Sequence, residues 1–322
     1  MARKPRVHYP SALYHVIMRG NARQDIFFDD EDRCRFYLLL QEGIERYGHR
    51  IHAFCLMTNH VHLAIQVGEV PLSRIMQNLT FRYTRWVNWR QNRSGHLFQG
   101  RFKAILVDAD SYLLELTRYI YLNPVRAGMV QSPEEYPWGG HRAYLGKDTI
   151  PWLTTDLVLS QFAGTKARAR RQYGEFVEQG KGEGHRQEYH SGADSDSRIL
   201  GSDTFIGDVL AQVEARPQQR IGLDDIIMPV CRRYGIEGKA MKAPGKYRNL
   251  SEARGMAAWL ILETSGATLA ELSRYSGRDV STLSTAAKSL QIRAKSDHGL
   301  AECMKELLAS VRQVAHYQSL VG

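Results

Sequence analysis

Hydrophobic and polar positions follow strand and helix periods through residues 12–107. Short apolar runs predict strands at 12–19, 50–57, 60–67 and 102–107, and apolar side chains at helical spacing predict helices at 31–47 and 72–91. This order predicts an α+β fold of the ferredoxin-like βαββαβ type, in which both helices cover one face of an antiparallel sheet. We expect the other face to be open, as a platform for nucleic acid.

The rest of the chain predicts mostly helices. One helix at 112–122 ends before Asn123-Pro124, and residues 157–179 have a helical pattern. Residues 179–202 are rich in Gly, Ser, His and acidic residues, which predicts a flexible linker. Helices follow at 206–215, 223–234, 251–264, 268–276 and 280–290, the last two with helix-turn-helix spacing around Gly277. We therefore predict a catalytic domain at 1–155, a helical extension and linker at 156–205, and an all-helical domain at 206–322.

The positive net charge of the chain indicates a polyanion as a binding partner. The 322 residues carry a formal net charge of +9, which favours nucleic acid, although an ordinary basic protein has a similar balance. None of the four cysteines forms a C-x-x-C pair, so free thiols are expected rather than a zinc site or disulfides. The sequence has no signal-peptide or membrane-span pattern, and we expect a cytoplasmic protein.

Two histidines on one predicted strand are candidate metal ligands. His60 and His62 point the same way because side chains alternate along a strand, and two imidazoles on one face can hold a divalent cation. The alternative is two half-buried polar residues. Tyr119 and Asn123 stand four apart on a predicted helix and so share a face. An Asn amide oxygen suits a hard cation such as Mg²⁺ or Mn²⁺.

Together these side chains would suit phosphoryl transfer. The cation would stabilise the charge that develops on a phosphate, while the Tyr119 oxygen attacks phosphorus and gives a phosphotyrosine and a free hydroxyl. Without the histidines, Tyr119 and Tyr121 would be ordinary packing residues, and Asn123-Pro124 a common helix end.

Arginines and aromatic residues are interleaved on the predicted helix at 72–91. Arg82, Arg85 and Arg90 there, with Arg101 and Lys103 beyond it, are candidate contacts to a DNA backbone. The alternative is a solvated face with core aromatics. Contacts of this kind weaken as salt concentration rises.

Three motifs carry a resemblance to a known family. They are Asn59-His60-Val61-His62, the segment at 95–103 (GHLFQGRFK), and the segment at 119–128 (YIYLNPVRAG). Residues 8–153 thereby resemble the HUH-type single-tyrosine transposases, in particular the REP-associated, IS200-like group.

The resemblance implies roles for single residues. His60 and His62 would be metal ligands, Asn123 the third ligand, Tyr119 the nucleophile and Tyr121 its rival. Arg126 joins the candidate DNA contacts. The family's substrate is single-stranded DNA, often beside a hairpin; cleavage leaves a 5′-phosphotyrosine and a free 3′-OH before strands are rejoined.

Residues 221–291 are similar to the DNA-binding domain of the bacterial replication initiator DnaA. The carrying segments are 246–250 (KYRNL), 253–257 (ARGMA) and 277–282 (GRDVST). The resemblance implies DNA contacts at Arg248, Asp279, Ser281 and Thr282, and Arg278 is a basic neighbour. Val280 stands where that family usually has a base-reading histidine, so sequence readout stays open; a helical module that only packs or oligomerises is the alternative.

The leading hypothesis is a metal-dependent single-tyrosine DNA strand transferase, a monomer or homodimer, acting at hairpin or repetitive DNA. Its C-terminal module would contact duplex or hairpin DNA. One alternative is a non-catalytic DNA-binding regulator. Another is a metal nuclease that uses activated water, which would leave no covalent adduct and would not need Tyr119.

Overall fold

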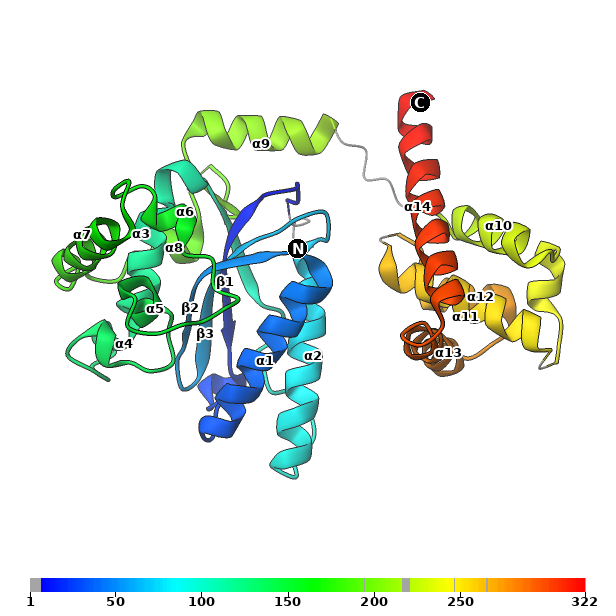
Figure 1. The fold of residues 1–322 in the computed structure, drawn as a ribbon, viewed down its shortest axis with the longest axis horizontal. Helices are drawn as coiled ribbons and strands as arrows, with labels where there is room; N and C mark the ends of the chain where they lie inside the picture. Colours follow the sequence, from blue (N-terminus) through cyan, green and yellow to red (C-terminus); the bar gives the residue numbers. More distant parts are fainter. Residues whose placement is uncertain (1–6, 194, 216–220, 246, 265, 322) are drawn as a thin grey trace. The chain divides into compact units, whose positions relative to one another are not determined.

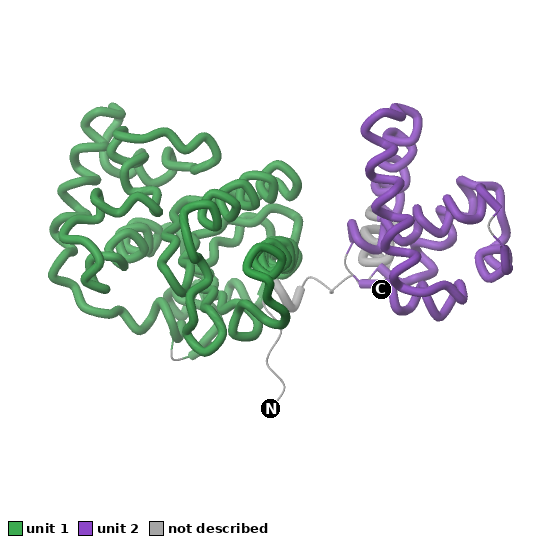
Figure 2. Tube along the Cα trace, turned by 90° about the horizontal axis from the view of Figure 1, so that it is seen from below, with its two compact units in different colours: residues 1–214 green, residues 215–322 purple. Residues whose placement is uncertain are grey.

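The computed structural model describes residues 7–193, 195–215, 221–245, 247–264 and 266–321. The chain divides into two compact units, unit 1 at residues 1–214 and unit 2 at residues 215–322, shown in green and purple in Figure 2. Each unit has its own hydrophobic core, so each is described by itself.

A five-stranded sheet lies at the centre of unit 1 (Figure 1). Its strands are β1 (Leu13–Arg19), β2 (Arg50–Leu56), β3 (His60–Gln66), β4 (Lys103–Val107) and β5 (Ile199–Leu200). The order is β2-β3-β1-β4-β5; the first four are antiparallel to their neighbours, and β5 joins β4 in parallel. The predicted α+β fold with an antiparallel four-stranded core is confirmed, and β5 is an addition.

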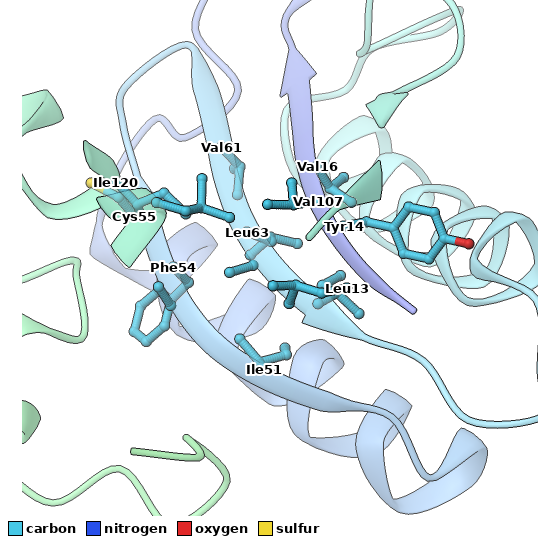
Figure 3. Packing of buried hydrophobic residues seen from close by; sticks show 14 of the residues in the cluster. Leu13, Tyr14, Val16, Ile51, Phe54, Cys55, Val61, Leu63, Val107 and Ile120 are labelled. Atoms are coloured by element: carbon cyan, nitrogen blue, oxygen red, sulfur yellow. The ribbon is translucent and has the colours of Figure 1, made fainter. Parts of the chain in front are cut away.

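Two long helices, α1 (Asp30–Tyr47) and α2 (Leu72–Arg90), cover one face of this sheet (Figure 1). The Asp29 carboxylate caps α1 by accepting from the Asp32 amide, and Gly48 ends the helix in the left-handed conformation at φ 65°. Ile65 of β3 lines a small space with residues of both helices. Val61 and Leu63 share its face and lie in the buried cluster of Figure 3. His60 and His62 therefore face the opposite side of the sheet.

Helices cover that opposite side too. After α3 (Ala109–Tyr121), which packs on β2 and β3, come α4 (Asn123–Arg126), η2 (Pro133–Glu135), α5 (His141–Leu145), α6 (Asp156–Leu159), α7 (Lys166–Gln179) and α8 (Glu188–Ser191). Figure 1 shows α3, α5 and α8 across the sheet from α1 and α2. The expectation of an open face is wrong because the apolar stripe of α3, which includes Leu113, Leu116 and Ile120, is buried there.

The segment predicted as a flexible linker is part of unit 1. The Tyr189 side chain is fully buried, and the Leu106 and Asp108 amides donate to the Arg198 and Leu200 carbonyls across the β4–β5 pair. Helix α9 (Asp203–Ala215) adds Ile206 to the same core, although the sequence assigned this residue to the C-terminal domain. The polar composition concealed a few well-spaced apolar side chains that suffice to hold the backbone.

The regular elements among the described residues of unit 2 are all helices. Its elements are α10 (Leu223–Tyr234), η3 (Gly238–Lys242), α11 (Arg248–Glu263), α12 (Leu269–Ser276), α13 (Val280–Arg293) and α14 (His298–Val321). A capping box of Thr268 and Glu271 starts α12, and Gly277 ends it at φ 63°, a conformation that favours glycine. The predicted helix-turn-helix spacing is confirmed. No helix among the described residues of either unit is long and apolar enough to cross a membrane.

Candidate active site

The two predicted metal ligands lie side by side at the start of β3. His60 pairs with Arg19 of β1 and His62 with Ile17, and the two imidazole centroids are 5.0 Å apart. Burial lowers the pKa of His60 to about 4 and that of His62 well below the ordinary value. Both rings are therefore neutral near pH 7, which is the form that binds a metal.

Each imidazole is held through its Nδ1 atom. The Nδ1 of His60 is 2.7 Å from the Asn59 Oδ1, and that amide is itself oriented because its Nδ2 donates to the Arg23 carbonyl. The Nδ1 of His62 is 2.9 Å from the Nε2 of His15 on β1. Holding one ring nitrogen leaves the other, Nε2, as the ligand atom, as is usual for metal-binding histidines.

Helix α3 brings Tyr119 to the same place. Its ring centroid lies 6.3 Å from that of His62, and its hydroxyl is 2.7 Å from the Nε2 of His190 on α8. The Arg126 guanidinium stacks over the Tyr119 ring with Cζ 4.2 Å from the centroid. Burial raises the pKa of Tyr119, and the charge of Arg126 opposes this rise.

Asn123 follows one turn after Tyr119 and is only partly buried. Its Nδ2 donates to the carbonyls of Tyr119, at 3.0 Å, and Ile120, at 3.2 Å. The amide hydrogens are thus used on the helix, and Oδ1 is left as a possible ligand. Within the described residues, no group of three or more His, Cys, Asp or Glu side chains is arranged to hold a metal. Imidazole nitrogen and amide oxygen are donor types that suit a divalent cation, so His60, His62 and Asn123 stay the predicted ligands.

The rival tyrosine occupies another environment. Tyr121 is buried against His141 and Tyr144, with ring centroids 5.7 and 5.8 Å away. In the part of the chain that the structure describes, its hydroxyl has no hydrogen-bond partner. Of the two tyrosines, it is Tyr119 whose ring lies beside that of His62, whereas Tyr121 packs against His141 and Tyr144.

Four further residues, which are not among those predicted from the sequence, lie at the candidate site. His15 contacts His62, the Tyr189 ring packs on Tyr119 with centroids 4.8 Å apart and planes inclined by 37°, and His185 stacks on His190 at 4.5 Å. In the sequence, the only hint of these residues was the presence of histidines at 185 and 190 in a polar segment. Their contacts with residues of β1 and α3 depend on the path of the backbone, which hydrophobic periodicity does not predict.

Some of the candidate DNA contacts of unit 1 are already paired with carboxylates, and others line cavities. Arg90 is committed to Asp29, Glu31 and Asp32, and Arg82 pairs with Glu42. Arg85 and Arg101 instead line a cavity of about 720 Å³ with the exposed Phe81. Lys103 lies on β4 beside a second cavity.

In unit 2, Ser281 and Thr282 are exposed on the first turn of α13, and Arg248 is exposed at the start of α11. The guanidinium of Arg278 has a structural role, because it donates hydrogen bonds to the carbonyls of Ala243 and Gly245. Asp279 precedes α13, and Val280 is exposed.

Each of these two regions matches a known protein family. Residues 8–123 match the family described as "Transposase IS200 like". Unit 1 thus holds a region that is similar to the IS200-like transposases. Residues 223–290 match the family described as "Bacterial dnaA protein helix-turn-helix", so both resemblances stated from the motifs are confirmed.

Two single proteins are similar to this IS200-like region. A Haemophilus influenzae protein assigned as a REP-associated tyrosine transposase is 26% identical over 133 residues, which cover 35% of this chain and 76% of that protein. A solved structure of a REP-associated tyrosine transposase bound to a REP hairpin has a TM-score of 0.40 and 16% identity, and covers 49% of this chain and 93% of that chain. The family match ends at Asn123, so Arg126 and α8 lie beyond it.

Proposed function

We propose that unit 1 is a metal-dependent DNA strand transferase that cleaves single-stranded DNA beside a hairpin and rejoins it. The observation that carries this proposal is the convergence of the Tyr119 ring with His60 and His62, whose Nε2 atoms are left for a cation. The match of residues 8–123 to the IS200-like transposases supports it.

His60, His62 and Asn123 would hold Mg²⁺ or Mn²⁺. When bound, the cation would supply Lewis acidity at the scissile phosphate. The Tyr119 oxygen forms a bond to phosphorus, the bond from phosphorus to the 3′ oxygen breaks, and that oxygen takes up a proton. The product is a 5′-phosphotyrosine with a free 3′-OH, and attack of a 3′-OH on the phosphotyrosine reverses the step.

The neighbours of Tyr119 prepare the nucleophile. Burial lowers the pKa of His190 to about 4, so its imidazole is neutral near pH 7 and accepts the hydrogen bond of the phenol. The proton of Tyr119 would leave toward this nitrogen, while Arg126 stabilises the negative oxygen.

DNA affinity would come from both units. Arg85 and Arg101 beside the 720 Å³ cavity, with Lys103, would bind backbone phosphates near the site. Arg82 and Arg90 could join only by exchanging their carboxylate partners for phosphate. In unit 2, the exposed Arg248, Ser281 and Thr282 would contact duplex or hairpin DNA, as the DnaA-like match suggests.

The test is a covalent-adduct assay. The full chain is incubated with Mn²⁺ and end-labelled single-stranded hairpin oligonucleotides, and a denaturing gel resolves protein-linked DNA. The proposal predicts a metal-dependent adduct that is absent from Tyr119→Phe and from the His60→Ala, His62→Ala double variant, and present in Tyr121→Phe. Cleavage without adduct would instead show a water-using nuclease, and hairpin binding with neither would favour a DNA-binding regulator.

A further inference from the structure

A fully buried histidine on β1, His15, has both ring nitrogens engaged. It pairs directly with Ala64 of β3, so it lies diagonally next to His62 on the same face of the sheet. The two imidazoles are stacked, with centroids 5.2 Å apart and planes inclined by 14°. His15 Nδ1 is 2.9 Å from the Tyr189 carbonyl oxygen, and His15 Nε2 is 2.9 Å from His62 Nδ1.

The chemistry of these atoms fixes where the protons are. A carbonyl oxygen can only accept, so the His15 Nδ1 must carry a hydrogen and donate it to Tyr189. A second proton on His15 would place a charge at a position without solvent, between a carbonyl and another imidazole, which is costly. The Nε2 of a neutral His15 is then an acceptor, and the His62 Nδ1 must be the donor.

We infer that His15 is a positioning residue that holds His62 in the Nδ1–H tautomer and so leaves the His62 Nε2 lone pair for the cation. This inference rests on the proposed function only in taking His62 as a metal ligand. If His15 Nε2 were instead the donor and His62 Nδ1 the acceptor, the hydrogen of the neutral His62 would lie on Nε2 and block this atom as a ligand.

The Tyr189 carbonyl, which accepts the hydrogen bond from His15, belongs to a segment far away in the sequence. Tyr189 lies on α8, 174 residues from His15, and its buried ring anchors the helix that presents the carbonyl. Because α8 lies beyond residues 8–123, the acceptor that fixes the protonation of His62 comes from outside the stretch that matches the IS200-like family.

The direct test reads the tautomer in metal-free protein. Long-range ¹H–¹⁵N correlation of ¹⁵N-histidine-labelled full chain, with His62 assigned from the His62→Ala variant, should show His62 protonated at Nδ1 and bare at Nε2. A His62 protonated at Nε2 would overturn the inference. This measurement uses neither DNA nor metal, so its result is separate from that of the adduct assay.

Substitution then tests whether His15 is the cause. His15→Phe keeps a ring and removes both nitrogens, so Mn²⁺ affinity measured by titration with electron paramagnetic resonance should fall by about tenfold or more. His15→Gln can place an amide oxygen near the Nε2 position and should recover part of the affinity. The matched control is His52→Phe, which removes an equally buried histidine from β2, whose partner is Gln66; it should bind Mn²⁺ as the natural chain does.

Folding is followed by circular dichroism in EDTA. A folded His15→Phe that binds Mn²⁺ like the His52→Phe control would overturn the inference. If His15→Phe does not fold, the inference is tested by the tautomer of His62 in the natural chain and by the Mn²⁺ affinity of His15→Gln. If the natural chain binds no Mn²⁺ and forms no adduct, the proposed metal-dependent function fails, while the tautomer is still measured.

Discussion

The two faces of α3 carry tyrosines two residues apart in surroundings that differ in kind. Tyr119 and Tyr121 are both almost fully buried. The hydroxyl of Tyr119 meets His190, and Arg126 stacks on its ring, whereas Tyr121 lies among His141, Tyr144 and a close-packed backbone. Burial alone therefore does not distinguish the proposed nucleophile from a packing residue; the partners of the two hydroxyls differ.

The largest expected effect separates the two tyrosines by activity. Tyr119→Phe removes the only oxygen that the proposed reaction can join to phosphorus, so the adduct should disappear from the gel while the protein stays folded. Tyr121→Phe should retain the adduct. Loss of the adduct in Tyr121→Phe with retention in Tyr119→Phe would reverse the comparison and move the nucleophile to the other face of the helix.

Arg126 provides the next contrast, because its guanidinium lies over the ring of Tyr119. Replacement by Gln removes the positive charge that opposes the rise in the pKa of Tyr119, so this pKa should rise and adduct formation near neutral pH should slow by about tenfold. Single-turnover rates measured against pH should show the rate of Arg126→Gln rising toward higher pH.

Arg126→Lys serves as the control for charge, since it keeps the positive charge and loses the planar stacking on the ring. Its rate should lie between those of the natural chain and Arg126→Gln. An Arg126→Gln variant with an unchanged pH profile would show that the guanidinium only packs.

The sequence was sufficient for most of the fold and for one half of the site. The strands at β1–β4 and the helices at α1–α3 and α10–α13 have strong periods and clear ends, such as Gly48 and Gly277, so local pattern was enough. His60 and His62 lie on β3 and Tyr119 lies on α3, one turn before Asn123 at the start of α4, and their spacings in the sequence predict shared faces.

The other half of the site depends on tertiary contacts. His15 reaches His62 through the register of β1 with β3, and Tyr189 and His190 reach the site through a polar segment that predicts a linker. The contacts that hold that segment include the buried Tyr189 ring, a two-residue strand and the ion pair between Arg186 and Glu115, and none of these gives a periodic signal. A local pattern cannot report contacts made by residues 174 positions apart.

The two faces of α3 should share a dependence of stability on pH. Burial lowers the pKa of His141 on the Tyr121 side, and of His190 on the Tyr119 side, to about 4. Because the unfolded chain binds protons near pH 6.5 and the folded chain does not, stability is full above that pH and falls as the pH drops toward 4. His141 should contribute a loss on the order of 1–2 kcal/mol at pH 5.

Urea unfolding at pH 7.5 and pH 5 measures this loss. His141→Phe should lose stability less steeply between the two pH values than the natural chain, and its adduct formation at pH 7.5 should be unaffected. A His141→Phe protein with the same pH dependence as the natural chain would show that other buried histidines, such as His49, account for the effect.

The smallest expected effect is on the stability of the Tyr121 face. Among the described residues the Tyr121 hydroxyl is buried without a partner, and leaving a buried polar group unbonded costs free energy. Tyr121→Phe removes that hydroxyl and keeps the ring against His141, so the free energy of unfolding should stay within about 1 kcal/mol of the natural value, or rise. Tyr144→Phe is the matched control, because the Tyr144 hydroxyl donates to the His52 carbonyl at 2.7 Å and its removal should be destabilising by about 1 kcal/mol. Urea denaturation of both variants at pH 7.5 makes the comparison; a larger loss in Tyr121→Phe than in Tyr144→Phe would mean that the Tyr121 hydroxyl does have a partner, and that the two faces of α3 are more alike than the contacts indicate.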